Sequence, residues 1–133
     1  MISLQSDQYA ISKKSYRLVK LTKTDEFSSV FDFRRRISSE YLVLHFKPNH
    51  LAHARLGLVV SKKVAKTAVA RNYMRRVLRE LFRVNQSLMP ACDLVMNVRK
   101  KFVRSDFTQL QQQFNVLNQK LALQYDRDTK SST

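Results

Sequence analysis

The sequence of 133 residues contains only one glycine, one cysteine and two prolines. A dinucleotide-binding turn or a Walker loop needs several glycines, because the backbone must approach a phosphate closely at more than one position. Gly57 alone cannot supply them, which excludes these nucleotide sites. Cys92 alone can form neither an intramolecular disulfide nor a cysteine-rich zinc site, so the sequence fits a reducing compartment and predicts a cytoplasmic protein.

Long apolar runs and acidic residues are also scarce. No stretch approaches the ~20 apolar residues of a membrane-spanning helix, and the N-terminus lacks the continuous apolar segment of a signal peptide. The 10 acidic residues are scattered along the chain. A protein nuclease that uses metal ions needs several carboxylates converging on those ions. The sequence therefore predicts no catalytic residue and no metal site in the protein alone.

Positive charge is abundant, because 25 Lys and Arg face these 10 acids and leave a formal charge of +15. Hydrophobic residues make up 44% of the chain, enough for a core, so the charge belongs to a folded domain. Such an excess predicts an anionic partner, with nucleic acid ahead of a membrane surface. We expect a monomeric domain at residues 16–123, flanked by a loose N-terminal extension (1–15) and a loose C-terminal tail (124–133).

The pattern of apolar residues predicts a single α+β domain in the order helix, strand, strand, helix, strand, helix, with an additional short strand possible. Thr22 is expected to cap the first, short helix. β-Forming residues fill positions 41–46 and 55–61. We expect these two segments to be neighbouring strands, joined by the loop at residues 50–53.

The second half of the chain gives equally clear signals. Thr67 is expected to cap a helix that runs from Ala68 to about Gln86, ahead of Pro90. Residues 93–98 form the third predicted strand. Ser105 or Asp106 then caps a last helix, whose apolar positions keep a spacing of three and four: Phe107, Leu110, Phe114, Leu117 and Leu121.

The helix predicted from Ala68 separates apolar from basic residues. At 100° per residue an apolar stripe gathers on one side, formed by Ala70, Tyr73, Met74, Val77, Leu81 and Val84. Arginines occupy the opposite arc together with Phe82, which we expect to close a second edge of the core. Eight basic residues and one acid give residues 62–83 a net charge of +7. This segregation predicts a nucleic-acid surface, DNA or RNA, formed by Lys62, Lys63, Lys66, Arg71, Asn72, Arg75, Arg76, Arg79 and Arg83.

The same residues carry a resemblance to a known family. RLGLVVSKK at residues 55–63, followed by AVARNYMRRVLRELF at residues 68–82, resembles the signature of the bacterial ribonuclease P protein subunit. In that family a strand ending in Ser/Ala-Lys-Lys leads into a helix that opens with Arg-Asn-Arg. EFSSVF at residues 26–31 and DLVMNVRK at residues 93–100 resemble the family's first helix and later strand. The third position of Arg-Asn-Arg is Tyr73 here, which places in doubt a contact that relatives make with arginine.

The resemblance implies a role beside an RNA catalyst. Members are protein cofactors of a ribonucleoprotein endonuclease that removes the 5′ leader of precursor tRNA, with the RNA subunit carrying out Mg²⁺-dependent hydrolysis. It further implies that the basic helix faces the RNA subunit and that a cleft beside the first helix holds the leader. Phe27, Phe31 and His45 are the leader-contact candidates, although the two phenylalanines fit core packing equally well and His45 fits simple strand packing. The alternative is a ribosomal or general RNA-binding protein using the same helix.

The resemblance also implies the fold. It predicts an α/β sandwich related to domains of ribosomal proteins and translation factors, with a left-handed β-α-β crossover. Physical reasoning alone favours the opposite hand, since about 98% of such connections are right-handed.

Overall fold

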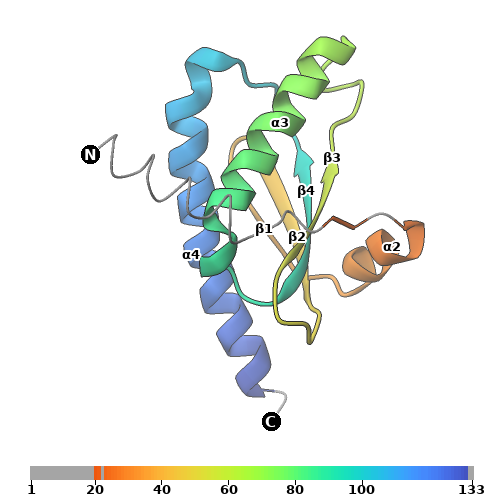
Figure 1. The fold of residues 1–133 in the computed structure, drawn as a ribbon, viewed down its shortest axis with the longest axis vertical. Helices are drawn as coiled ribbons and strands as arrows, with labels where there is room; N and C mark the ends of the chain where they lie inside the picture. Colours follow the sequence, from red (N-terminus) through yellow and green to blue (C-terminus); the bar gives the residue numbers. More distant parts are fainter. Residues whose placement is uncertain (1–19, 22, 132–133) are drawn as a thin grey trace.

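A computed structural model describes residues 20–21 and 23–131 of the chain. The predicted N-terminal extension and Thr22 lie outside these residues. The described chain is an α+β sandwich, which confirms the predicted fold class (Figure 1). Its elements are α2 (Thr24–Asp32), β1 (Arg36–Ser38), β2 (Leu42–Pro48), β3 (Arg55–Val59), α3 (Ala68–Asn85), η1 (Gln86–Leu88), β4 (Cys92–Val98), η2 (Arg104–Asp106) and α4 (Phe107–Ser131).

The four strands form one sheet in the order β1-β2-β4-β3. β1 is the additional short strand that the sequence allowed. The prediction that the strands at 41–46 and 55–61 are neighbours is wrong, because β4 lies between them, antiparallel to β2 and parallel to β3. β4 is buried along almost its whole length, with only Asn97 partly exposed. The strand that is buried most completely therefore lies inside the sheet, between β2 and β3, where both faces of the sheet are covered.

The connection from β3 through α3 to β4 is left-handed, as the family resemblance implies. In Figure 1 α3 lies in front of the sheet, β3 and β4 both run upward, and the upper part of β4 lies to the left of β3. A right-handed connection would place β4 on the other side of β3.

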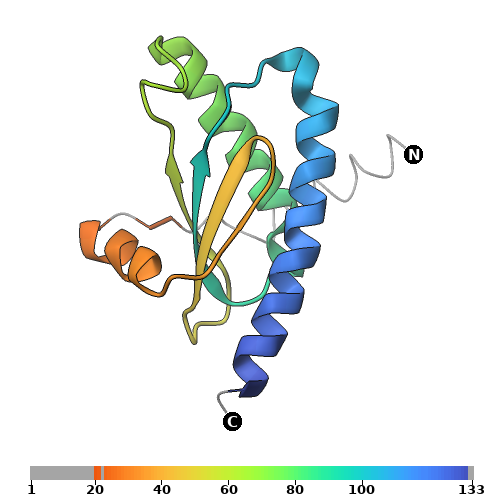
Figure 2. The same ribbon diagram turned by 180° about the vertical axis from the view of Figure 1, so that it is seen from behind.

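The helices cover the two faces of the sheet unequally. α3 and α4 pack on one face, and α2 lies on the other (Figures 1 and 2). Side chains alternate between the faces along β4. Leu94 and Met96 join the large core formed with α3 and α4, whereas Val95 joins a smaller cluster with Val30 of α2 and Leu21. α2 is thus held on the sheet by a small apolar contact of its own.

Polar groups at the helix starts satisfy backbone amides that have no partner within the helix. The Thr67 hydroxyl accepts a hydrogen bond from the Ala70 N–H (3.1 Å), as predicted. Ahead of α2, the Glu26 carboxylate accepts a bond from the Lys23 N–H (3.1 Å). Asp106 immediately precedes α4, and its carboxylate accepts a bond from the Val103 N–H (2.8 Å).

The predicted loose tail at residues 124–133 is wrong as far as Ser131, because α4 continues to that residue. Tyr125 follows Leu117 and Leu121 on the same side of the helix and packs against the large core. This added turn of the apolar stripe extends the helix past residue 123. None of the helices in the described part of the chain is long and apolar enough to cross a membrane.

Candidate nucleic-acid interface

α3 is seated in the core by Met74, Leu78, Leu81 and Phe82. Phe82 is fully buried, as expected for a residue that closes a second edge of the core. Val84, in contrast, was expected in the apolar stripe but is 38% exposed. The buried arc is therefore centred near Leu78 rather than near Val77, and Val84 instead lines a surface cavity between α3 and Phe107 of α4.

Two of the predicted RNA-contact arginines are engaged within the protein. The Arg71 guanidinium donates hydrogen bonds to the carbonyl oxygens of Ala65 (2.9 Å) and Lys66 (3.1 Å). Arg71 therefore fixes the segment that leads from β3 into α3. Arg83 donates to the Glu80 carboxylate (2.7 Å) three residues earlier, which compensates its charge.

The remaining three arginines of α3 have no carboxylate partner among the described residues: Arg75, Arg76 and Arg79. Arg76 is exposed and the other two are partly exposed. Asn72 is exposed as well, and its side-chain oxygen accepts a long hydrogen bond from Arg75 (3.3 Å). The three lysines of the preceding segment are all exposed: Lys62, Lys63 and Lys66. α3 and its entry loop thus present cations that the described carboxylates do not neutralise.

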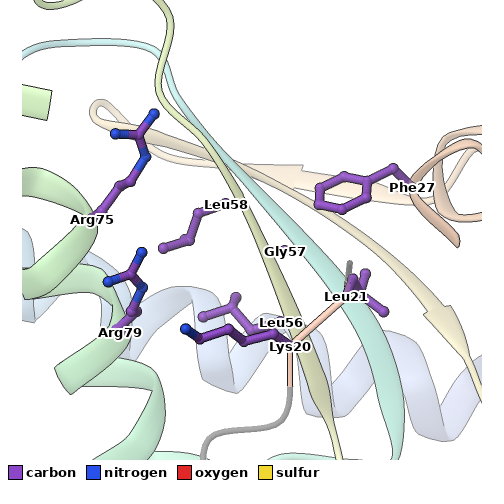
Figure 3. A pocket seen from close by; sticks show the side chains of 8 residues that line it. All are labelled: Lys20, Leu21, Phe27, Leu56, Gly57, Leu58, Arg75 and Arg79. Atoms are coloured by element: carbon purple, nitrogen blue, oxygen red, sulfur yellow. The ribbon is translucent and has the colours of Figure 1, made fainter. Parts of the chain in front are cut away.

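A cavity of about 170 Å³ along β3 connects this basic surface with α2 (Figure 3). Arg75 and Arg79 lie on its α3 side, and the Phe27 ring lies on its α2 side. Its lining consists of Lys20, Leu21, Phe27, Leu56, Gly57, Leu58, Arg75 and Arg79. One leader-contact candidate, Phe27, and two of the predicted RNA-binding arginines therefore line the same cavity along β3, an edge strand of the sheet.

The two phenylalanines of α2 have different surroundings. Phe27 packs against the small cluster that contains Val30, and its ring lies directly over Gly57. Phe31 is 37% exposed and meets the half-buried His45 edge to face, with 4.7 Å between the ring centroids. The structure thus gives Phe27 a packing role and leaves an accessible aromatic pair at Phe31.

His45 lies across from Arg36 in the β1–β2 pairing. Burial, and then the positive charge of Arg36, lower the pKa of His45 below its ordinary value. The ring is therefore neutral at neutral pH, and it presents an aromatic surface rather than a cation.

α2 leaves one row of the sheet uncovered. Val43, Asn97 and Val59 lie side by side across β2, β4 and β3, on the face that carries α2. Val59 is 36% exposed, and the chain continues from it toward Lys62 and Lys63. We refer to these three residues together with Phe31 and His45 as the α2 shelf.

Comparison with known proteins identifies the family. The family model described as Ribonuclease P matches residues 15–122. The chain belongs to the ribonuclease P protein family. Proteins of this family are components of ribonuclease P, which processes the 5′ ends of tRNA.

Individual ribonuclease P proteins support the assignment. The ribonuclease P protein component of Chromobacterium violaceum is 45% identical over 106 residues, which cover 80% of this chain and 88% of that protein. The component of Azoarcus sp. is 52% identical over 79 residues, which cover 59% of this chain and 66% of that protein. The solved RNase P protein of Thermotoga maritima is 31% identical, with a TM-score of 0.69 over 76% of this chain and 96% of that one.

Tyr73 occupies the third position of the ribonuclease P signature and packs in the core. Its ring meets the buried Phe102 edge to face, with 6.2 Å between the centroids, and contacts the large apolar cluster. The position where the signature has an arginine therefore carries a structural aromatic side chain here. Arg75 and Arg76 supply cations in the following turn.

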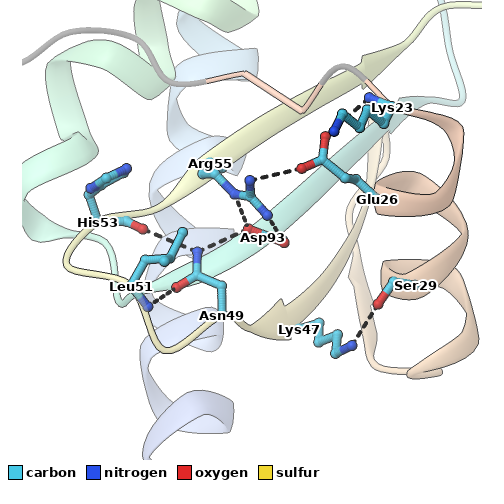
Figure 4. Close-up of polar contacts among 9 residues, drawn as sticks. All are labelled: Lys23, Glu26, Ser29, Lys47, Asn49, Leu51, His53, Arg55 and Asp93. Atoms are coloured by element: carbon cyan, nitrogen blue, oxygen red, sulfur yellow. Dashed lines mark hydrogen bonds and ion pairs between the residues drawn. The ribbon is translucent and has the colours of Figure 1, made fainter.

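Sequence reasoning missed one polar network of this ribonuclease P protein. Arg55 bridges Glu26 of α2 and Asp93 of β4 (Figure 4). The available signal was a charged residue at or next to the start of two largely apolar strands, Arg55 in β3 and Asp93 in β4. No three His, Cys, Asp or Glu side chains come together as a metal site in the part of the chain that the structure describes. The carboxylates of Glu26 and Asp93, which lie near each other, are both bound by Arg55.

Proposed function

We propose that this chain is the protein subunit that binds the catalytic RNA of ribonuclease P and the 5′ leader of precursor tRNA, in the cytoplasm. The RNA subunit carries out hydrolysis of the phosphodiester bond. The observation that carries the proposal is the set of α3 arginines without carboxylate partners, Arg75, Arg76 and Arg79, beside three exposed lysines.

Electrostatics favours an RNA phosphate backbone at this surface. Arg75 stands four residues from both Arg71 and Arg79, and each such like-charged pair costs a helix about 0.2–0.5 kcal/mol. Phosphates relieve this repulsion, and the guanidinium fork binds two phosphate oxygens at once. The Arg71 bonds to Ala65 and Lys66 hold the lysine-bearing loop against α3, so loop and helix act as one surface.

The leader is proposed to lie along the α2 shelf. Single-stranded RNA binds where aromatic rings offer stacking surfaces beside basic residues. Phe31 and the neutral His45 supply such rings. Arg36 lies across from His45 in the β1–β2 pairing, and the exposed Lys62 follows Val59 three residues later along the chain. Phe27 contributes by packing beneath the shelf rather than by stacking on a base.

Mg²⁺ belongs in this proposal to the RNA and to the RNA–protein complex. The described side chains do not fit a metal site of the protein's own, since Glu26 and Asp93 are both engaged by Arg55. We assign no metal ligand to the protein, and its contribution is positive charge that lowers the repulsion between RNA phosphates.

Reconstitution tests the proposal. The purified chain, added to a bacterial ribonuclease P RNA at low Mg²⁺, should stimulate removal of the leader from precursor tRNA, and the chain alone should cut nothing. A charge-matched basic protein serves as the control for nonspecific stimulation. Absence of stimulation would contradict the proposal, and copurification with ribosomal RNA in place of a single catalytic RNA would favour a general RNA-binding role.

The leader contact has its own test. Phe31→Ala should weaken binding of leader-bearing precursor tRNA by about 1–3 kcal/mol, the contribution of one stacked base. Phe33→Ala is the matched control, because Phe33 is also exposed (41%) but lies beside Asp25 and Asp32 on another side of α2. Equal losses from both variants would contradict leader binding on the shelf.

A further inference from the structure

A polar row of the sheet lies beneath α2, next to the row that carries the aromatic contacts. Lys47, Asp93 and Arg55 are side by side across β2, β4 and β3. One row further along, His45, Val95 and Gly57 are side by side in the same way. α2 crosses both rows, so the polar row and the aromatic row together form its seat.

Arg55 is the centre of the polar row. Its Nε and Nη2 donate to the two carboxylate oxygens of Asp93 (2.8 and 2.7 Å), and its Nη1 donates to Glu26 of α2 (2.9 Å). The Arg55 side chain is only 24% exposed and the Asp93 side chain 11%. The hydrogen bonds that Arg55 donates to Asp93 outweigh burial and raise the pKa of Arg55 above its ordinary value. The bidentate geometry fixes the plane of the guanidinium, and with it the position of Glu26.

The network extends in both directions from Asp93. Asn49, in the turn after β2, donates to Asp93 (2.9 Å) and to the His53 carbonyl (3.1 Å), which ties the β2–β3 loop to the same carboxylate. On the other side of the row, Lys47 donates to the Ser29 hydroxyl (2.6 Å). α2 is therefore attached at two positions three residues apart, which face the same side of a helix.

This attachment determines where the aromatic side chains stand. Glu26 and Ser29 are bound to the polar row, and Phe27 and Phe31 in turn fall on Gly57 and His45 of the neighbouring row. The apolar contact beneath α2 is small and consists of the cluster around Val30 and the Phe27 ring on Gly57, so we expect the polar row to contribute much of what fixes the helix along the sheet. A shift of α2 by one residue would move Phe31 away from His45.

Arg55 is poorly placed to bind RNA itself. Three of its five N–H donors are used by carboxylates, and a phosphate that approached it would meet the negative charges of Glu26 and Asp93. We propose that Arg55 is a positioning residue for the leader, acting through Glu26 to hold α2 where Phe31 and His45 form the shelf. The inference rests on the proposed leader binding.

The experiment uses the full chain reconstituted with ribonuclease P RNA and two precursor tRNAs, one with a long leader and one with a single leader nucleotide. Arg55→Met removes both ion pairs. Glu26→Gln weakens the ion pair that attaches α2, keeps an oxygen that can accept the Lys23 N–H, and leaves the Arg55–Asp93 contact in place. Glu40→Gln is the control, because it disrupts the exposed Glu40–Lys100 ion pair in the turn before β2. Amide hydrogen exchange of the free proteins is measured in parallel.

Arg55→Met and Glu26→Gln should both raise KM for the long-leader substrate about fivefold or more, the effect of losing one stacked base. Neither variant should change kcat or the kinetics with the short-leader substrate. Exchange should quicken in residues 24–32 and stay constant in α3 and α4. If the wild type prefers the long-leader substrate and Glu26→Gln keeps the same preference, the positioning role of Arg55 is overturned, whereas the proposed leader binding is not. A wild type without leader preference overturns the proposed leader binding instead, and faster exchange throughout either variant shows that Arg55 serves overall stability only.

Discussion

The ring of Phe27 lies so close to Gly57 that a Cβ atom at the glycine would stand 2.6 Å from two of its carbons, Cε2 and Cζ. The single glycine of the chain is therefore located where an α2 ring rests directly on β3. A glycine inside a strand weakens it unless another group must approach the backbone closely, and here the approaching group is the aromatic ring. The contact joins α2 to the strand that leads toward the basic helix.

Gly57→Ala is expected to lower the free energy of unfolding by about 1–3 kcal/mol, because the added methyl group must displace Phe27. Urea denaturation of both proteins measures the effect. Phe27→Leu in the Gly57→Ala background is the matched rescue, since the shorter side chain makes room for the methyl group. If the Gly57→Ala single variant had the same urea midpoint as wild type, the Phe27 ring would have space to move away from the added methyl group.

Arg71 and Arg75 are expected to behave differently, although both belong to the same basic arc. Arg75→Ala should flatten the dependence of log K for RNA on log salt by about 0.7–0.9, the loss of one phosphate contact, with little change in stability. Arg71→Ala should also lower the melting temperature, because it removes hydrogen bonds to the Ala65 and Lys66 carbonyls. Salt titration and thermal denaturation separate the two, and identical behaviour would contradict the different roles.

Tyr73→Arg restores the Arg-Asn-Arg signature but is expected to destabilise this protein by about 1–3 kcal/mol. The substitution replaces a ring that packs against Phe102 with a charged group that the apolar cluster cannot solvate. Chemical denaturation and RNA affinity are measured together. A variant of wild-type stability that binds RNA more tightly would show that the ring is dispensable for packing.

Acid should weaken the fold through Asp93. Burial alone would raise the pKa of this carboxyl, but hydrogen bonds from Arg55 and Asn49 hold it below its ordinary value. A carboxyl whose pKa is lower in the folded state stabilises the protein above the unfolded-state pKa of about 3.9, and loses that contribution as the pH falls further. Wild type should therefore be more stable than Asp93→Asn at pH 7, with a gap that narrows below about pH 4. Asp32→Asn, which removes an exposed carboxylate of α2, is the control. If the difference in stability between wild type and Asp93→Asn did not change with pH, the Asp93 carboxylate would not be the source of the acid sensitivity.

Local structure was predictable from the sequence wherever it depends on the residues of one short segment. The cap at Thr67, the span of α3 and the burial of β4 all follow from spacing and residue type within a short window. The basic arc of α3 was predictable for the same reason. The role of Arg71 was not, because its hydrogen bonds depend on how the preceding loop returns to the helix.

Features that depend on the order of strands were not predictable locally. Two strands that follow one another along the chain are commonly paired, yet β4 separates β2 from β3 here. The Arg55–Asp93 contact exists only because these strands are paired in that register. Phe27 and Phe31 are the same residue type one helical turn apart, and the positions of Gly57 and His45 across the sheet give them different surroundings.

The central position of β4 has a consequence for synthesis of the chain. β2 and β3 emerge first but have no strand to join them until residues 92–98 have been made, about 30 positions after the end of β3. α3 is therefore complete, with its arginines, before the sheet that covers its apolar side exists. Pairing over such sequence distances is slow to form, so the nascent chain presents a basic amphipathic helix to its surroundings before the domain closes around it.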